Sequence, residues 1–119
     1  MKKLTDKELT IMDALWEHGE LSIRDLINYL PEPAPHFNTV ATYVRRLEVH
    51  GMIRHRELSA KFYLYDAAVS RERYINALQK ESVNKFFGGS YMDFISNLVK
   101  EHDVSIDELK ELIRMIEEE

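Results

Sequence analysis

Apolar residues recur every three or four positions over most of the chain, which predicts a largely helical protein. The first helix is expected to begin at the capping box of residues 5–8 and to end at Gly19. A second, shorter helix begins at Ser22 and stops at the proline-rich connector 31–35, and a third covers residues 38–50.

The pattern changes after the third helix. The segments MIRHREL and KFYLYDA are rich in strand-forming residues and partly alternate, which predicts a hairpin over residues 52–66. One face of this hairpin is expected to carry Ile53, Phe62 and Leu64. Its basic residues are expected to stay in solvent: Arg54, Arg56 and Lys61.

The helical pattern then returns up to the end of the chain. One helix is expected to run from Ser70 to a break at Gly88 and Gly89, and two more begin at the caps Ser90 and Ser105. Helices of this size bury little apolar surface alone, so we expect a second copy of the chain to cover their stripes. The residues predicted to form this homodimer are Tyr91, Phe94, Ile95, Leu98, Val99, Leu109, Leu112, Ile113 and Ile116.

The predicted fold class is therefore mainly α with a small β-hairpin. Residues 1–68 are expected to form a winged helix-turn-helix DNA-binding domain, in which the hairpin is the wing. Residues 69–119 are expected to form a helical dimerisation region.

The third predicted helix has two unlike faces. At 100° per residue, Val40, Val44 and Leu47 fall on one side, which is expected to pack against the first two helices. The other side is small and polar at first and cationic further along, so it can bond base edges and phosphates in a major groove. The residues predicted to contact DNA are Asn38, Thr39, Ala41, Thr42, Arg45 and Arg46 on this helix and Arg54, Arg56 and Lys61 on the wing.

The net charge of −5 argues only weakly against a nucleic-acid partner. Residues 36–61 hold five Lys and Arg against two Glu, a local charge of +3, whereas acidic residues dominate 101–119. The local patch, not the sum, decides whether a surface attracts phosphate.

Several other functions are excluded. The chain has no cysteine, and its five histidines are too scattered for a metal site. It has no glycine-rich phosphate loop and no arrangement that indicates a catalytic triad, so we predict no enzyme, no metal and no cofactor. No apolar run reaches the ~18 residues of a membrane span, and the N-terminus is too polar for a secretory signal. A cytoplasmic protein without membrane insertion is expected.

A second interpretation stays open from the residues alone. A winged helix can also act as an adaptor or ligand-sensing module through protein contact rather than by DNA binding. In that case, replacing Arg45 and Arg46 with alanine would leave function intact, whereas changes at Phe94 or Ile95 would abolish it.

Four stretches together resemble the penicillinase repressor family: LTDKELTIMDALWEHGELSIRDLINYL, NTVATYVRRLEVHGMIRH, KFYLYDA and FFGGSYMDFISNLVKEHDVSIDELKELIRMI. The resemblance implies a bacterial transcriptional repressor that binds, as a homodimer, a pseudo-palindromic double-stranded operator with TACA/TGTA-type half-sites. Thr39, Thr42 and Arg46 match family residues, and Asn38 occupies a usual contact position. Ala41 replaces a longer side chain, and Val49 also departs from the family, where a lysine is common.

The same resemblance implies a mode of regulation. Family members that respond to β-lactams are inactivated by proteolysis at an Asn-Phe bond in the dimerisation region. The resemblance therefore implies a membrane-bound sensor protease as a partner. The matching bond here is Asn97-Leu98. Copper-responsive relatives carry a cysteine-rich tail, so the lack of cysteine argues against copper sensing.

Overall fold

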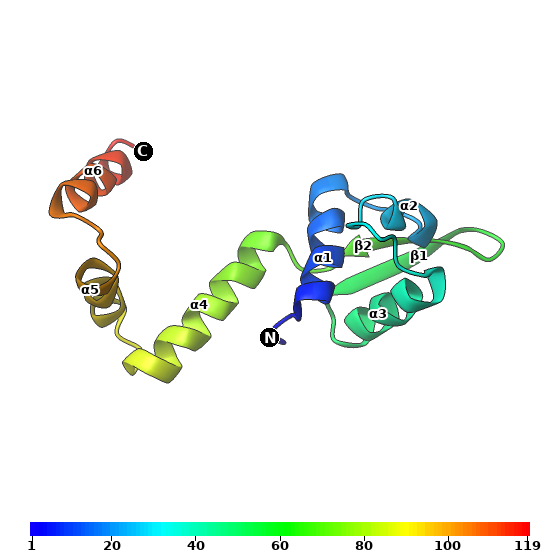
Figure 1. The fold of residues 1–119 in the computed structure, drawn as a ribbon, viewed down its shortest axis with the longest axis horizontal. Helices are drawn as coiled ribbons and strands as arrows, with labels where there is room; N and C mark the ends of the chain where they lie inside the picture. Colours follow the sequence, from blue (N-terminus) through cyan, green and yellow to red (C-terminus); the bar gives the residue numbers. More distant parts are fainter. The chain divides into compact units, whose positions relative to one another are not determined.

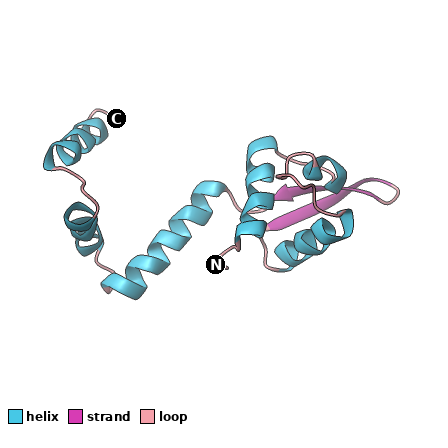
Figure 2. Ribbon diagram, viewed as in Figure 1, coloured by secondary structure: helices cyan, strands magenta, loops and turns pink.

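The computed structural model describes residues 1–119, with the element order helix, helix, helix, hairpin and three further helices (Figure 1). Figure 2 shows the hairpin as the two strands among the helices. This confirms the predicted fold class, mainly α with a small β-hairpin. The elements are α1 (Asp6–His18), α2 (Ile23–Ile27), α3 (Phe37–Val49), β1 (Ile53–Ser59), β2 (Phe62–Ala67), α4 (Arg71–Phe87), α5 (Tyr91–Glu101) and α6 (Ile106–Glu117).

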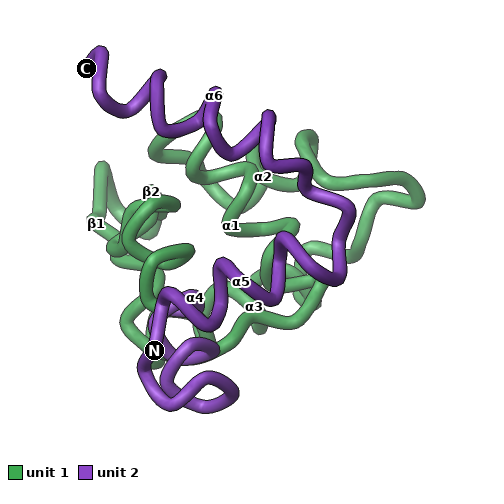
Figure 3. Tube along the Cα trace, turned by 90° about the vertical axis from the view of Figure 1, so that its left-hand side faces the viewer, with its two compact units in different colours: residues 1–77 green, residues 78–119 purple.

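The chain divides into two compact units, residues 1–77 and 78–119 (Figure 3). The boundary lies later than the expected position at residue 68, because the chain after the hairpin is still bonded to the first unit. Trp16 Nε1 donates to Val69 O at 2.9 Å, and Leu4 N donates to the Tyr74 hydroxyl at 2.8 Å. The first turn of α4 therefore belongs to the winged-helix unit.

Local capping determines where the first helix begins. Glu8 N donates to Thr5 Oγ1 at 3.3 Å, and Thr5 N donates to Glu8 Oε1 at 3.0 Å, so the predicted capping box is confirmed. The helix ends at Gly19, whose φ of +79° is one that glycine adopts without strain. The second helix begins after Ser22 as predicted but ends at Ile27, earlier than the expected stop at the prolines.

The core of the first unit lies where α1, α2 and α3 meet the start of the hairpin. Its largest fully buried side chains come from α1, α2, α3 and the turn before β1. They are Met12, Leu15, Leu26, Val40, Val44, Leu47 and Met52. A cluster of apolar side chains removed from water in this way stabilises the packing of α3 by its inner face.

The hairpin register corrects one prediction. The antiparallel strands pair Ile53 with Ala67 and Arg56 with Leu64, and the register shifts between Glu57 and Ser59. Residues that face each other across such strands share a face of the sheet, so Leu64 lies with Arg56 and not with Ile53. The expected face of Ile53, Phe62 and Leu64 was wrong. In the observed register, Phe62 and Leu64 lie on the face opposite Ile53.

The second unit has less buried apolar surface of its own. Val83 is fully buried, and the rings of Phe87 and Phe94 meet edge to face at 5.6 Å. The predicted caps are present: Asp93 N donates to Ser90 Oγ at 3.1 Å, and Ser105 forms a capping box with Glu108. No residue of α5 or α6 is buried.

Candidate nucleic-acid interface

The third helix has the two predicted faces. Val40, Val44 and Leu47 are buried, so this side anchors α3 in the core. Five of the six helix residues predicted to contact DNA are exposed on the other side: Asn38, Thr39, Thr42, Arg45 and Arg46. These five side chains are therefore accessible to a DNA duplex.

Ala41 is the exception, because only 6% of its surface is exposed. It lies about 60° around the helix from the buried Val44, and its side chain belongs to the inner face. Ala41 was predicted to contact DNA, but its burial leaves little of its side chain available to a base. A side chain on the shoulder of a helix is buried or exposed according to its tertiary neighbours, which the helical period does not specify.

We call the exposed side of α3, formed by Asn38, Thr39, Thr42, Arg45 and Arg46, the reading face. It has no internal ion pair. Neither Arg45 nor Arg46 has a carboxylate partner, and the only bond of the Arg45 side chain is from Nε to Ala41 O at 3.3 Å. Thr42 Oγ1 donates to Asn38 O at 2.9 Å, which leaves the lone pairs of the hydroxyl free to accept. Two unpaired guanidinium groups beside small polar side chains form a surface able to take phosphates and base edges.

The arginines of the wing are in a different state. Arg56 donates to both carboxylate oxygens of Glu20 at 2.8 Å, and Arg54 Nη2 lies 3.3 Å from Asp66 Oδ2. The hydrogen bond from Arg56 holds the pKa of the Glu20 carboxyl below its usual value, and the same bond raises the pKa of Arg56. Both arginines of the wing therefore have a carboxylate partner, although the side chains of Arg54 and Arg56 are 70% and 57% exposed.

Lys61 lies at the tip of the wing. Its φ is +61°, and its backbone N–H donates to Glu57 Oε1 at 3.1 Å. Its ammonium group has no partner in the structure. Of the three basic wing residues, Lys61 is the one whose charge is not balanced by a carboxylate.

A hydrogen bond also connects the wing to α3. The His55 ring of β1 bonds Glu48 of α3 through Nδ1, and its edge meets the Tyr63 ring at 5.6 Å. Burial, and next the nearby Glu48 charge, raise the pKa of the neighbouring Tyr65 hydroxyl. These contacts hold the wing in a defined position beside α3.

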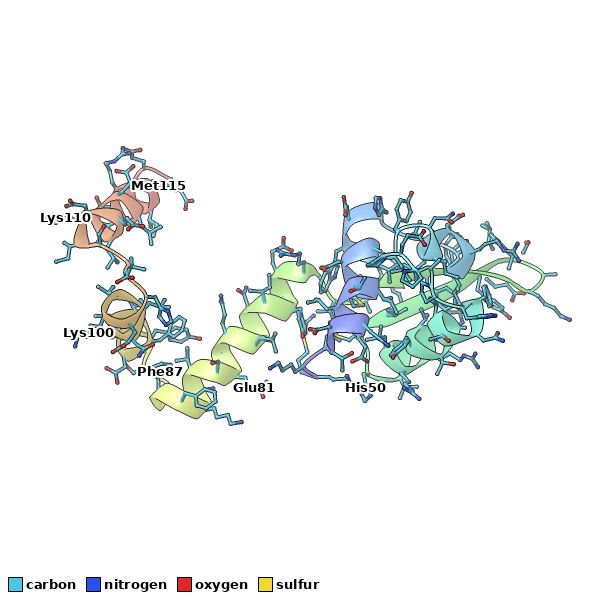
Figure 4. All side chains as sticks on the ribbon, in the orientation of Figure 1. His50, Glu81, Phe87, Lys100, Lys110 and Met115 are labelled. Carbon is cyan, nitrogen blue, oxygen red and sulfur yellow. The ribbon has the colours of Figure 1, made fainter.

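Sequence reasoning missed other basic residues beside this surface. Lys2 and Lys7 line a hollow of about 540 Å³ beside Arg46 and His50, the last labelled at the end of α3 in Figure 4. Asp6 and Glu8 line the same hollow, and Lys2 is paired with Glu8 at 2.7 Å. On the wing side, Arg24 of α2 lines a smaller hollow with Lys61. No local signal identifies these residues, because their proximity to α3 and the wing depends on how the elements pack.

The apolar stripes of α5 and α6 reach solvent, as the prediction of a partner requires. Figure 4 shows the side chains of α6, including Lys110 and Met115, projecting from the helix. The exposed fractions are 42% for Ile95, 51% for Ile113 and 59% for Ile116. The remaining predicted stripe residues are exposed (Tyr91 and Leu112) or half-buried (Phe94, Leu98, Val99 and Leu109).

The Asn97-Leu98 bond lies in the middle of α5, and both side chains are half-buried. No group of three His, Cys, Asp or Glu side chains is arranged to hold a metal ion. None of the helices combines the length and apolar content needed to cross a bilayer.

Three helices, a hairpin wing and an outward polar and cationic face on the third helix define a winged-helix DNA-binding regulator. The chain belongs to the penicillinase repressor family, whose profile matches residues 4–118. It is thus a transcriptional repressor and not an enzyme. The expected resemblance is confirmed.

The chain is also similar to individual proteins. The chain is 25% identical over 122 residues to the penicillinase repressor of Bacillus licheniformis, across 99% of this chain and 94% of the relative. The structure of Bordetella bronchiseptica BpsR, whose DNA binding is regulated by 6-hydroxynicotinic acid, is similar with a TM-score of 0.50 and 17% identity, over 98% of this chain and 75% of that one. A MarR family transcriptional regulator from Silicibacter pomeroyi DSS gives a TM-score of 0.46 and 18% identity, over 93% and 66%.

Proposed function

We propose that the protein represses transcription by binding, as a homodimer, a pseudo-palindromic operator with TACA/TGTA-type half-sites. The observation that carries this proposal is the outer face of α3, where polar and unpaired cationic side chains are exposed on a helix anchored by its other side. A helix held in this way can enter a major groove without rearrangement.

Within this face, the small residues and the arginines have separate roles. Asn38, Thr39 and Thr42 lie in the first turns, where they contact base edges and specify the half-site. Arg45 and Arg46 follow one turn later and contact a guanine edge or a phosphate. A good bidentate base contact discriminates against a wrong base by about 1–3 kcal/mol.

The exposed stripes of α5 and α6 support a dimer of this chain. On α6 the residues Leu109, Leu112, Ile113 and Ile116 fall within about 100° of one another at 100° per residue, and none is buried. A continuous apolar stripe of this kind is covered by packing against another helix. Two copies related by a twofold axis present two α3 helices to two half-sites, and this coupling raises the operator affinity by avidity.

Cleavage at Asn97-Leu98 would end repression by removing this coupling. The cut would separate Leu98, Val99 and the whole of α6 from the rest of the chain. Because the bond lies inside α5, a protease would need this helix to open locally. A membrane-bound sensor protease is the partner that this route implies.

Operator binding is tested by fluorescence anisotropy on a duplex with two TACA/TGTA half-sites, a duplex with one, and a scrambled duplex. We expect tighter binding to the two-site duplex and a linear fall of log K with log salt concentration. Arg46→Ala should weaken binding, whereas Lys100→Ala should not, since it removes the same charge from the α5 side opposite the stripe. Equal binding to all duplexes, or no binding, would contradict the proposal.

The dimer and the cleavage route are tested separately. Sedimentation equilibrium should show a dimer for the intact chain and a monomer for a chain that ends at Asn97. The shortened chain should bind the two-site duplex no better than the one-site duplex. A shortened chain that keeps the full preference for two half-sites would contradict the cleavage route.

A further inference from the structure

Glu48 of α3 has two potential partners, one on its own helix and one on the wing. It follows Arg45 by three residues, and side chains at this spacing are neighbours on a helix surface. In the structure its carboxylate is bonded instead to Nδ1 of His55 on β1. A carboxylate only accepts hydrogen bonds, so Nδ1 carries the proton and donates. The guanidinium group of Arg45 has no carboxylate partner.

An arginine on another helix of the same chain behaves differently. On α6, Arg114 is paired with Glu111, three residues before it, and with Glu118, four residues after it. An arginine of this chain therefore binds the carboxylates of its own helix where no other group holds them. Arg45 does not, and the group that holds its acidic neighbour is the imidazole of His55.

The imidazole is itself held in place by β2. The ring of Tyr63 meets it edge to face at 5.6 Å, and the ring of Tyr65, its partner in the hairpin register, lies 5.7 Å away. The hairpin therefore restricts the direction in which His55 donates. Besides burial, the charge of Glu48 raises the pKa of the Tyr65 hydroxyl and the charge of Arg45 lowers it. Both charged groups of α3 thus lie near the same point of the wing.

We propose that His55 is a positioning residue for operator binding: it holds the carboxylate of Glu48 and so leaves the guanidinium group of Arg45 free for DNA. Without the imidazole, Glu48 would pair with Arg45 and balance its charge. A cation balanced in this way attracts phosphate less. This inference rests on the proposed function, which assigns Arg45 to a guanine edge or a phosphate. It gives His55 an effect on binding without a contact to DNA.

Rescue by a second substitution tests this role. In fluorescence anisotropy on the two-site duplex, His55→Ala should weaken binding about two- to fivefold, the equivalent of one exposed ion pair that DNA must break. The double variant of His55→Ala and Glu48→Ala should bind at least as tightly as the unchanged chain, because no carboxylate is left to occupy Arg45. His55→Gln should also bind like the unchanged chain, since its amide N–H can donate to Glu48.

Controls make each outcome decisive. Glu81→Ala, at the position labelled on α4 in Figure 4, removes the same charge from an exposed site and should not restore the binding of His55→Ala. Urea unfolding followed by the fluorescence of Trp16 verifies that the first unit of each variant is folded.

Two results would overturn the inference. If the double variant stays as weak as His55→Ala, the imidazole acts on DNA or on the wing directly and not through Glu48. If His55→Ala binds as tightly as the unchanged chain, Glu48 does not compete for Arg45. A different result concerns the proposed function itself, which fails if the unchanged chain binds no DNA or if Arg45→Ala binds as tightly as the unchanged chain.

Discussion

Tyr74 makes the hydrogen bond that joins the start of α4 to the N-terminal segment, and its removal gives a quantitative test of the first unit. Its hydroxyl accepts from Leu4 N at 2.8 Å, and the two residues are only 5% and 8% exposed. Tyr74→Phe keeps the ring beside Trp16, 5.8 Å away between centroids, but leaves the Leu4 N–H buried without an acceptor. An unsatisfied buried donor costs about 1–3 kcal/mol, so we expect a loss of this size in the free energy of unfolding.

Urea unfolding followed by tryptophan fluorescence measures this loss. Trp16 is the only tryptophan and its indole contacts the same segment through Val69, so the signal reports the first unit. The midpoint should fall without a change in m, because the surface exposed on unfolding stays the same. In thermal unfolding, each kcal/mol lost should lower Tm by about 4–8 °C for a unit of this size.

Tyr29→Phe is the matched control, because the Tyr29 hydroxyl has no hydrogen-bond partner and the residue is 50% exposed. Its stability should stay within about 0.5 kcal/mol of the unchanged chain. If Tyr74→Phe is as stable as Tyr29→Phe, the Leu4 N–H has found another acceptor. The explanation given for the position of the unit boundary would then be wrong.

Three further changes have defined outcomes. Burial raises the pKa of Glu8, but bonds from Lys2 and Thr5 outweigh it and lower the pKa overall. This stabilisation is complete above the unfolded pKa of about 4.3 and is lost as pH falls through the lower folded value. The urea midpoints of the unchanged chain and Glu8→Gln should therefore converge as the pH falls through that folded value. Ile113→Glu places a charge in the proposed dimer stripe and should raise the dimer Kd at least ~10-fold, since a loss of ~1.4 kcal/mol suffices for that change. Sedimentation equilibrium measures this Kd, and an unchanged value would show that α6 is not part of the interface. Gly51→Ala should lower the free energy of urea unfolding by about 1–2 kcal/mol, because φ is +78° there; an unaltered midpoint would show that this strain is relieved.

Features that depend on neighbouring residues could be predicted from the sequence. The capping boxes at Thr5 and Ser105 and the caps at Ser22 and Ser90 are present, because a cap needs only a side chain and an N–H three residues further on. The buried side of α3 was also predictable, since the helical period alone places Val40, Val44 and Leu47 together.

Features that depend on distant residues could not be predicted. Arg56 bonds Glu20, which is 36 residues away in sequence, and the adjacent Leu21 pairs with Tyr65 of the hairpin. The hairpin register depends on a shift near its tip, where the turn has no Asn or Gly to select a turn type. An alternating pattern without a known turn leaves the faces of the wing undetermined, which explains why Phe62 and Leu64 were assigned to the wrong face.

The same helical pattern leads to opposite burial in the two units, and this contrast is the strongest physical argument for a partner. In the first unit, three helices and a hairpin approach from different directions, so side chains such as Val44 and Leu47 are surrounded within one chain. In α6, Ile113 and Ile116 have the same spacing but stay more than half exposed. Periodicity specifies which residues share a face, but not which molecule covers it. In the proposed homodimer, the stripe of a second copy would supply an apolar surface of matching chemistry.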